Sequence, residues 1–157
     1  REGLIDKLGF SIYTSEQVDQ LIDSFDFDLI QLPINVFDVR LLEGGQLKSL
    51  NQRGIEIHAR SIFLQGLLLD LKNIPRYFSR WEESFKQYQE IVKNKELSLL
   101  EYALSFVSNI HEIDKVVVGV NSRDELIEIN NSSREIRNLE PFPIDDVKLL
   151  NPSMWNL

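Results

Sequence analysis

The segment Ile55-Glu56-Ile57-His58-Ala59-Arg60-Ser61 alternates apolar and polar side chains and ends in polar residues, as a strand with one buried face does. Three other segments share this form, a short apolar run with a polar tip that leads into a helical pattern: Leu8-Gly9-Phe10-Ser11-Ile12-Tyr13, Leu29-Ile30-Gln31-Leu32 and Val116-Val117-Val118-Gly119-Val120-Asn121. Repetition of strand, polar tip and helix is typical of parallel β/α units. Barrels of such units build their ligand site at the C-terminal strand ends. The repeat therefore predicts where a site lies before it identifies a ligand.

The number of these units is small for a complete barrel. The 157 residues suit one domain, yet four β/α units are half of the eight that an α/β barrel needs. The chain also begins at Arg1, without an initiator Met, in what resembles the end of a helix. We therefore expect a fragment of a (β/α)8 TIM-type barrel. The hydrophobic share of 43% is sufficient for a core.

Composition excludes several classes of function. With 25 acidic against 17 basic residues and a net charge of −8, the chain has no general field that attracts nucleic acid or anionic lipid. Cysteine is absent, which excludes disulfides, thiol chemistry and Cys-based metal sites. No apolar run reaches the roughly 18–20 residues of a membrane span, and no signal-peptide pattern is present. We expect a cytoplasmic protein without a membrane or nucleic-acid partner.

Helical spacing predicts the connecting elements. Helices are expected over residues 15–25, over 38–53 with an interruption at Gly44-Gly45, from Pro75 through Val92, from Ser98 through Val107, and after Ser122. Residues 61–73 lack clear periodicity. The whole chain, 1–157, is expected to be one unit, with a polar, proline-containing tail over 130–157 that wraps the surface.

Strand alternation predicts which side chains face a ligand. Leu8, Phe10 and Ile12, like Ile55, Ile57 and Ala59, belong against the helices. Ser11, Gln31, Arg60 and Asn121 then ring the mouth of the barrel. A buried Arg60 without a carboxylate or phosphate would be costly, so it is the best single candidate for touching a ligand; pairing with Glu56 or another carboxylate would serve as well. Glu56 and His58 are expected to be partners within the barrel rather than catalysts.

Other chemistry-bearing residues have structural explanations. Basic and aromatic residues alternate over 75–81, as in some single-strand binders, but the spacing of Phe78, Trp81, Phe85, Tyr88 and Val92 predicts core packing. His111 has no second His or Cys nearby and is expected in a loop, so no metal site is predicted.

At the strand ends the chain resembles the C-terminal half of an aldo-keto reductase, from about Gly3 to Ile129. Gly9-Phe10-Ser11 resembles the Gly-Val-Ser of the fifth barrel strand, and Gln31-Leu32-Pro33-Ile34-Asn35 the Gln-x-x-x-Asn of the sixth. Residues 60–68 resemble the seventh strand and its loop. Gly119-Val120-Asn121-Ser122 with Glu125-Leu126 resembles the eighth strand and the helix start that grips the cofactor.

This resemblance implies reversible reduction of an aldehyde or ketone by NADPH bound across the barrel mouth. Family members use Asp, Tyr, Lys and His, with Tyr as general acid, and all four lie in the first half of the barrel. No catalytic residue is therefore assigned here, and the chain alone is expected to be inactive.

The resemblance also implies cofactor contacts. Ser11 and Gln31 would bind the nicotinamide carboxamide. Ser61, Phe63, Leu64 and Gly66 would lie along the pyrophosphate. Gly119, Asn121, Ser122 and Arg123 would grip the adenosine end and favour a 2′-phosphate. Two positions depart from the family pattern: Ile12 follows the serine where Asn is common, and Arg60 replaces an aromatic that stacks on the nicotinamide. Arg60 would instead reach the pyrophosphate or an acidic substrate.

Two alternatives stay open. One is a non-catalytic barrel kept as a binding or regulatory protein, and the other is an unrelated β/α barrel that binds phosphate. In each case a half barrel leaves unpaired strand edges, so the chain is expected to associate with the missing N-terminal half or with itself, burying on the order of 1,000 Å² or more.

Overall fold

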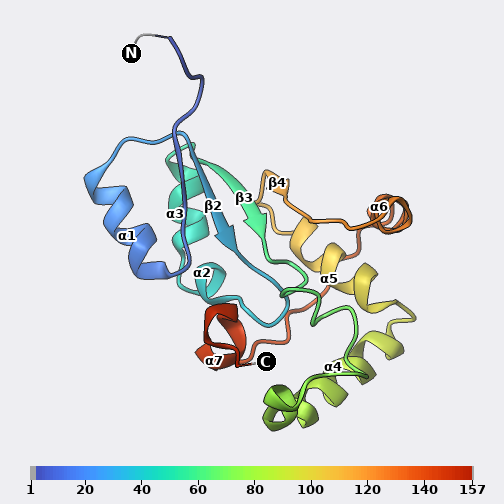
Figure 1. Ribbon diagram of the computed structural model, residues 1–157. Helices are drawn as coiled ribbons and strands as arrows, with labels where there is room; N and C mark the ends of the chain where they lie inside the picture. Colours follow the sequence, from blue (N-terminus) through green and yellow to red (C-terminus); the bar gives the residue numbers. More distant parts are fainter. Residues whose placement is uncertain (1–2, 157) are drawn as a thin grey trace.

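The chain forms a parallel sheet with helices between its strands. The computed structural model describes residues 3–156. Its sheet has the order β1-β2-β3-β4, with β1 at Gly9–Ser11, β2 at Leu29–Pro33, β3 at Glu56–Arg60 and β4 at Lys115–Val116 (Figure 1). Every neighbouring pair is parallel, which confirms the predicted β/α units.

The fourth strand is shorter than predicted. Its expected range was 116–121, but only Lys115–Val116 pairs in the ladder, and the last bond runs from the Val117 N–H to the Ala59 carbonyl at 2.7 Å. The physical reason is that, among residues 3–156, β4 is an edge strand paired with β3 alone, and β3 ends at Arg60. Residues 118–121 therefore continue without a ladder partner in the described chain.

Helices connect the strands much as the periodicity predicts. Their bounds are α1 Ser15–Ser24, α2 Arg40–Glu43, α3 Gln46–Gln52, η1 Arg76–Trp81, α4 Glu82–Asn94, α5 Leu99–Ser108, α6 Arg123–Ser132, α7 Val147–Leu150 and η2 Pro152–Met154. Capping side chains fix several starts: the Thr14 hydroxyl accepts from the Gln17 N–H, and the Ser98 hydroxyl from the Glu101 N–H. Gly45, at φ 82°, separates α2 from α3 in a conformation that glycine tolerates best.

The two faces of the sheet differ as strand alternation predicts. Ile30, Leu32, Ile57 and Ala59 are fully buried, with α3 packed on β3 and α5 on β4. Gln31, Glu56, His58 and Arg60 point to the opposite face and are half-buried. The aromatic stripe from Phe78 to Val92 lies in the core, which confirms the packing interpretation. Among residues 3–156 no helix combines the length and the apolar character that crossing a membrane requires.

The C-terminal tail is more than the predicted surface wrap. It lies against the β2–α2 connection, where the Phe142 N–H donates to the Val36 carbonyl at 2.8 Å and the Ile144 N–H to the Phe37 carbonyl at 3.1 Å. Leu149 and Leu150, in α7, are buried. A four-residue helix between prolines is too short to show a period, so the sequence pattern missed it. The tail forms one wall of a cavity at the strand ends.

Candidate functional site

Polar side chains gather where the parallel strands end. Ser11 lies opposite Gln31 in the β1–β2 register, and Pro33 lies opposite Arg60 in the β2–β3 register. Residues opposite one another in parallel strands point to the same face of the sheet, so Ser11 and Gln31 share a face. Arg60, four residues beyond Glu56, projects to that face too. The three predicted strand tips therefore stand on adjoining parallel strands.

The loop after β3 has an unusual backbone. Ser61, Leu64 and Gln65 have φ values of 57°, 45° and 55°, and Gly66 has 84°. A non-glycine residue in this region costs on the order of 1 kcal/mol or more, so the surrounding structure must hold the loop in place. Its turns use the N–H groups of Leu64 and Gly66. Within the described chain, the N–H groups at positions 62, 63 and 65 have no acceptor.

A cavity of about 670 Å³ lies between this loop and the segment after β4. We call it the β3–β4 cavity. Seven of the predicted cofactor residues line it: Gln31, Arg60, Ser61, Phe63, Gly66, Gly119 and Asn121. Ser11, Leu64, Ser122 and Arg123 do not line it. Residues 62, 63 and 65, whose N–H groups have no acceptor within the described chain, also line this cavity.

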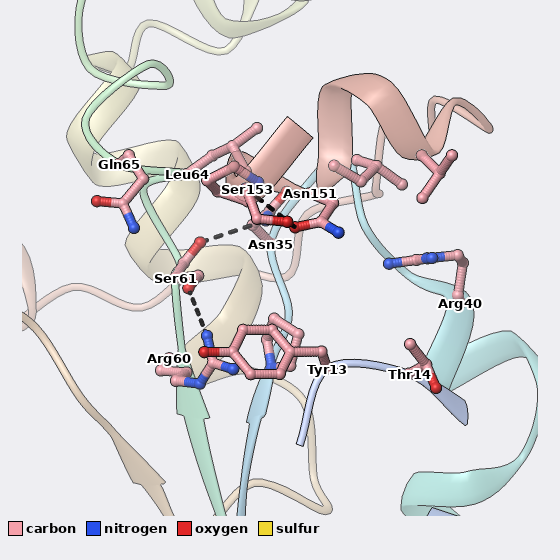
Figure 2. A pocket seen from close by; sticks show the side chains of 14 residues that line it. Tyr13, Thr14, Asn35, Arg40, Arg60, Ser61, Leu64, Gln65, Asn151 and Ser153 are labelled. Atoms are coloured by element: carbon pink, nitrogen blue, oxygen red, sulfur yellow. Dashed lines mark hydrogen bonds between the residues drawn. The ribbon is translucent and has the colours of Figure 1, made fainter. Parts of the chain in front are cut away.

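A second cavity, of about 480 Å³, lies on the other side of the loop (Figure 2). We call it the tail cavity because residues 147 and 150–153 form one wall. Leu64 lines this cavity, and Arg60, Ser61 and Gln65 line both cavities. Asn35, Arg40, Asn151 and Ser153 also line it, and sequence reasoning named none of them as site residues. Their proximity depends on the docking of the tail, for which the sequence carries no periodic signal.

Arg60 occupies the boundary between the two cavities. Its Nη1 donates to the Ser61 hydroxyl at 3.1 Å, and its Nη2 to the Ile12 carbonyl at 2.9 Å. Its guanidinium carbon lies 4.3 Å from the centre of the Tyr13 ring, a cation–π contact. The Nε is buried and has no acceptor in the described chain. None of these partners is a carboxylate, so the alternative of a neutralising pair with Glu56 is wrong.

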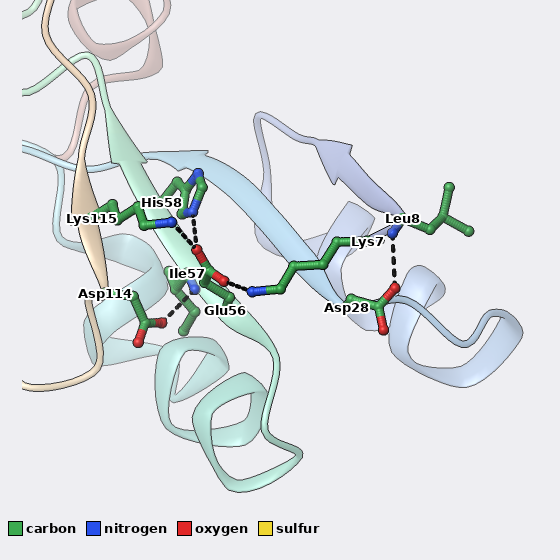
Figure 3. Close-up of polar contacts among 8 residues, drawn as sticks. All are labelled: Lys7, Leu8, Asp28, Glu56, Ile57, His58, Asp114 and Lys115. Atoms are coloured by element: carbon green, nitrogen blue, oxygen red, sulfur yellow. Dashed lines mark hydrogen bonds and ion pairs between the residues drawn. The ribbon is translucent and has the colours of Figure 1, made fainter. Parts of the chain in front are cut away.

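Glu56 is neutralised elsewhere, at the opposite end of the sheet (Figure 3). Its carboxylate accepts from the Lys115 ammonium at 2.6 Å, binds the Lys7 ammonium, and lies 2.6 Å from Nε2 of His58. Hydrogen bonds from Lys115, then Lys7 and His58, hold the pKa of Glu56 well below its usual range. The cluster joins β3, β4 and Lys7, which lies two residues before β1, across the sheet. The predicted Glu56–His58 partnership is confirmed, and its contacts are structural.

No group of three or more His, Asp or Glu side chains in residues 3–156 is arranged to hold a metal ion. The chemistry available at the strand ends is instead hydrogen bonding and one uncompensated guanidinium. A model of the aldo/keto reductase family matches residues 1–151 of the chain. The chain belongs to the aldo/keto reductase family.

Solved structures share the fold. The chain aligns with the apo form of aldo-keto reductase AKR11C1 from Bacillus halodurans at a TM-score of 0.63 and 16% identity, over 81% of this chain and 45% of that one. The holo form gives the same score and identity over 83% and 45%. The thermostable aldo-keto reductase Tm1743, in complex with the inhibitor epalrestat, gives 0.57 and 15% over 81% and 42%. The chain thus spans less than half the length of these proteins. A comparison with curated proteins found no match.

The fold of this aldo/keto reductase chain is therefore a partial (β/α) barrel, as predicted. The start of α6 is capped by two side chains, those of Ser122 and Glu125. The Ser122 hydroxyl accepts from the Glu125 N–H at 3.1 Å, and the Glu125 carboxylate accepts from the Asn121 N–H at 2.7 Å. The N–H groups of Arg123 and Asp124 keep no acceptor in the described residues. Arg123 is exposed there.

Proposed function

We propose that the chain is the C-terminal half, strands five to eight, of an NADP-dependent aldo-keto reductase that reduces an aldehyde or a ketone. Support comes from the family match, the four parallel β/α units, and the share of the solved relatives that the chain spans. Bound NADPH would supply the hydride that reduces the carbonyl carbon. The residues of this chain would hold and orient the cofactor in the β3–β4 cavity.

The observation that carries this proposal is the loop over 61–66. Residues 62, 63 and 65, whose N–H groups are free within the described chain, line a cavity large enough for part of a dinucleotide. Successive unused backbone donors form a concave site that suits phosphate oxygens. The Ser61 hydroxyl and the bare backbone of Gly66 extend the same surface. The donors present therefore fit a pyrophosphate.

The strand tips would hold the nicotinamide end. Ser11 and Gln31 lie opposite each other, and their side chains make no hydrogen bond within the described chain. A hydroxyl and an amide are suited to a carboxamide, which both donates and accepts. By fixing the carboxamide they would select the ring face that is presented to the substrate. The side chain of Ile12 is buried and gives the nicotinamide end no polar contact. Its carbonyl accepts from Nη2 of Arg60.

The adenosine end would lie at the start of α6. The free N–H groups of Arg123 and Asp124 suit an oxyanion at a helix N-terminus, and the Arg123 guanidinium would pair with a 2′-phosphate. Glu125 lines the β3–β4 cavity as well, but its carboxylate is held by the Asn121 N–H. Arg123 is the basis for proposing NADP rather than NAD.

The chain by itself should bind but not turn over. The proton donor and its partners are expected in the other half of the barrel, with the Tyr as general acid. The exposed edges also favour association. Exposed apolar side chains include Val117 and Val120, which follow β4, and Leu126 and Ile127 in α6. A stable, cooperatively folding monomer in light scattering would contradict the expectation that this edge takes a partner.

The test is NADPH binding to the full-length protein that contains this chain, followed by nucleotide fluorescence. Gly66→Ala should weaken binding, because Gly66 has φ 84° and a side chain there would strain the loop. Gly54→Ala is the matched control: Gly54 has φ 72°, lines neither cavity and leaves equal space around an added Cβ. Equal weakening in both variants would exclude the loop as the binding element.

Arg123 separates the two nucleotides. Arg123→Gln should raise the Kd for NADPH about tenfold and leave that for NADH unchanged, because only NADPH carries the 2′-phosphate. Binding without oxidation of NADPH by any aldehyde would favour the non-catalytic alternative. Absence of NADPH binding at millimolar concentration would refute the proposed function.

A further inference from the structure

The charged side chains that line the tail cavity are all basic, although the protein as a whole is acidic. The chain carries 25 acidic and 17 basic residues, yet two arginines, Arg40 and Arg60, line this cavity and no Asp, Glu or Lys does. Carboxylates are thus excluded from the walls of a cavity in an acidic molecule. A positive charge at this cavity that no carboxylate pairs with would attract an anion there.

The two arginines differ in their state. Arg40 is neutralised, because its Nε and Nη2 donate to the two carboxylate oxygens of Asp38, both at 2.8 Å. Arg60 has no such partner. A guanidinium has five N–H donors, and in the described chain only one on Nη1 and one on Nη2 of Arg60 have acceptors. Arg60 is therefore the uncompensated, half-buried charge at the tail cavity, and an unpaired charge is costly to bury.

Neutral donors line the same cavity as Arg60. The side-chain amides of Gln65 and Asn151 provide N–H groups, and the Tyr13 ring provides a hydroxyl. None of these donor groups has an acceptor in the part of the chain that the structure describes. Figure 2 shows Arg60 and Tyr13 on the strand side of the cavity and Asn151 on the tail side. A ligand between them would meet donors from two walls.

The tail wall is firmly anchored. The Tyr77 hydroxyl donates to the Lys148 carbonyl at 2.9 Å, and the Trp155 indole N–H donates to the Leu149 carbonyl at 3.0 Å. The Trp81 indole N–H donates to the Asp146 carboxylate at 3.2 Å. The Tyr77 and Trp81 bonds hold the tail against η1, and the Trp155 bond fixes the tail internally, so the donors at 151 stand at a fixed position. The cavity is preformed, which lowers the entropic cost of binding.

We propose that the tail cavity binds an anionic group, a carboxylate or a phosphate, carried by the carbonyl substrate of this enzyme. The inference rests on the proposed function, because it names the substrate class of the same site. Arg60 lines both cavities, so a substrate anion held by Arg60 lies beside the proposed cofactor cavity. The pyrophosphate of the cofactor could also supply oxyanions to Arg60. The experiments distinguish a substrate anion from the cofactor pyrophosphate.

The first experiment measures binding without turnover. Succinate is titrated into the isotope-labelled full-length protein, with and without saturating NADPH, and amide shifts are followed by NMR. Saturable shifts are expected at Leu64, Asn151 and Ser153, which line the tail cavity alone, and they should persist when NADPH is bound. Arg60→Gln should abolish them. Shifts confined to Gly119 and Asn121, or their loss on adding NADPH, would assign the anion to the cofactor cavity and overturn the proposal.

The second experiment measures specificity with a matched pair of aldehydes, 4-oxobutanoate and butanal, which differ by one carboxylate. The ratio of their kcat/KM values should favour the acid. Arg60→Gln should lower this ratio about 10- to 100-fold, the range for a lost hydrogen-bonded charge pair. The ratio cancels any effect on NADPH binding, which is common to both substrates. An unchanged ratio in Arg60→Gln would overturn the proposal.

Two further variants serve as controls for the Arg60→Gln result. Arg60→Lys keeps the charge without the planar fork, so the ratio should fall less than in Arg60→Gln. Arg53→Gln removes one cation at the opposite end of β3 and should leave the ratio unchanged, because Arg53 lines neither cavity. If neither aldehyde is reduced, the NMR titration decides whether the tail cavity binds anions, and NADPH binding decides separately whether the proposed function holds.

Discussion

Tyr88 carries a hydroxyl that the fold buries without a partner. The side chain is fully buried, and its hydroxyl has no hydrogen-bond partner in the described chain. Burial, with a smaller contribution from Tyr102, raises the pKa of the Tyr88 phenol above its usual range, so the hydroxyl stays protonated. We predict that Tyr88→Phe stabilises the protein, because it removes a desolvated polar group and keeps the ring.

The ring contacts set the magnitude. The Tyr88 ring packs edge-on against Phe37 at 5.1 Å and against Tyr102 at 5.5 Å, and a phenylalanine ring keeps both contacts. The change in the free energy of unfolding is then the cost of the unpaired hydroxyl, about 1–3 kcal/mol. For a chain of this length, each kcal/mol raises Tm by about 2–4 °C.

Tyr102 is the matched control in the same aromatic pair. Its hydroxyl donates to the Glu140 carbonyl at 2.8 Å, so Tyr102→Phe should lower stability by about 1 kcal/mol. Both variants delete one oxygen from a buried ring, and they should shift stability in opposite directions. Urea unfolding followed by tryptophan fluorescence measures both, with a midpoint shift of about 0.5 M for each kcal/mol. A Tyr88→Phe variant that is less stable than the parent would refute the reasoning.

Three further predictions concern the sheet and the tail. Gly9→Ala should lower the free energy of unfolding by about 1–3 kcal/mol, because its Cβ would lie 2.7 Å from the Leu29 carbonyl oxygen; an unchanged urea midpoint would contradict this. Leu149→Ala should cost about 2–5 kcal/mol, since the side chain is fully buried, and wild-type thermal stability would show that the tail does not pack as described. Glu56→Gln should lower stability at pH 7. Lys115, as the largest cause, lowers the pKa of Glu56 in the folded state. The stability difference between wild type and Glu56→Gln should therefore be complete above the unfolded pKa and disappear as the pH falls below about 4. A difference that stays constant from pH 7 to pH 2 would contradict the ion-pair explanation.

Much of the fold follows from local pattern. The alternation in residues 55–61 predicts that Ile57 and Ala59 are buried while Arg60 faces the other side, and the structure agrees. The helix starts predicted near residue 15 and at Ser98 are correct, and the Thr14 and Ser98 side chains cap these helices. These signals succeed because alternation and capping depend on neighbours within a few residues.

The site depends on contacts between distant residues. Arg60 donates to the carbonyl of Ile12, which lies 48 positions earlier in the chain. The tail bonds to the β2–α2 connection through Phe142 and Val36, which are more than 100 positions apart. The strand pattern predicts the contact of Glu56 with His58, but nothing local to these residues predicts that Lys7 and Lys115 also bind Glu56. The free N–H groups of the 61–66 loop also follow from its left-handed φ values. The residue types at Ser61, Leu64 and Gln65 do not predict such values, because none of them is glycine.

The sequence by itself determined the parallel β/α order, the buried and open faces of the sheet, and the strand tips at which polar side chains gather. Only the tertiary structure decided that the tail closes a second cavity, that β4 is short, and that Arg60 stands between two cavities without a carboxylate. The physical reason is range: periodicity and capping are written in adjacent residues, whereas the charge and shape of a cavity are set by walls that meet only after the chain has folded.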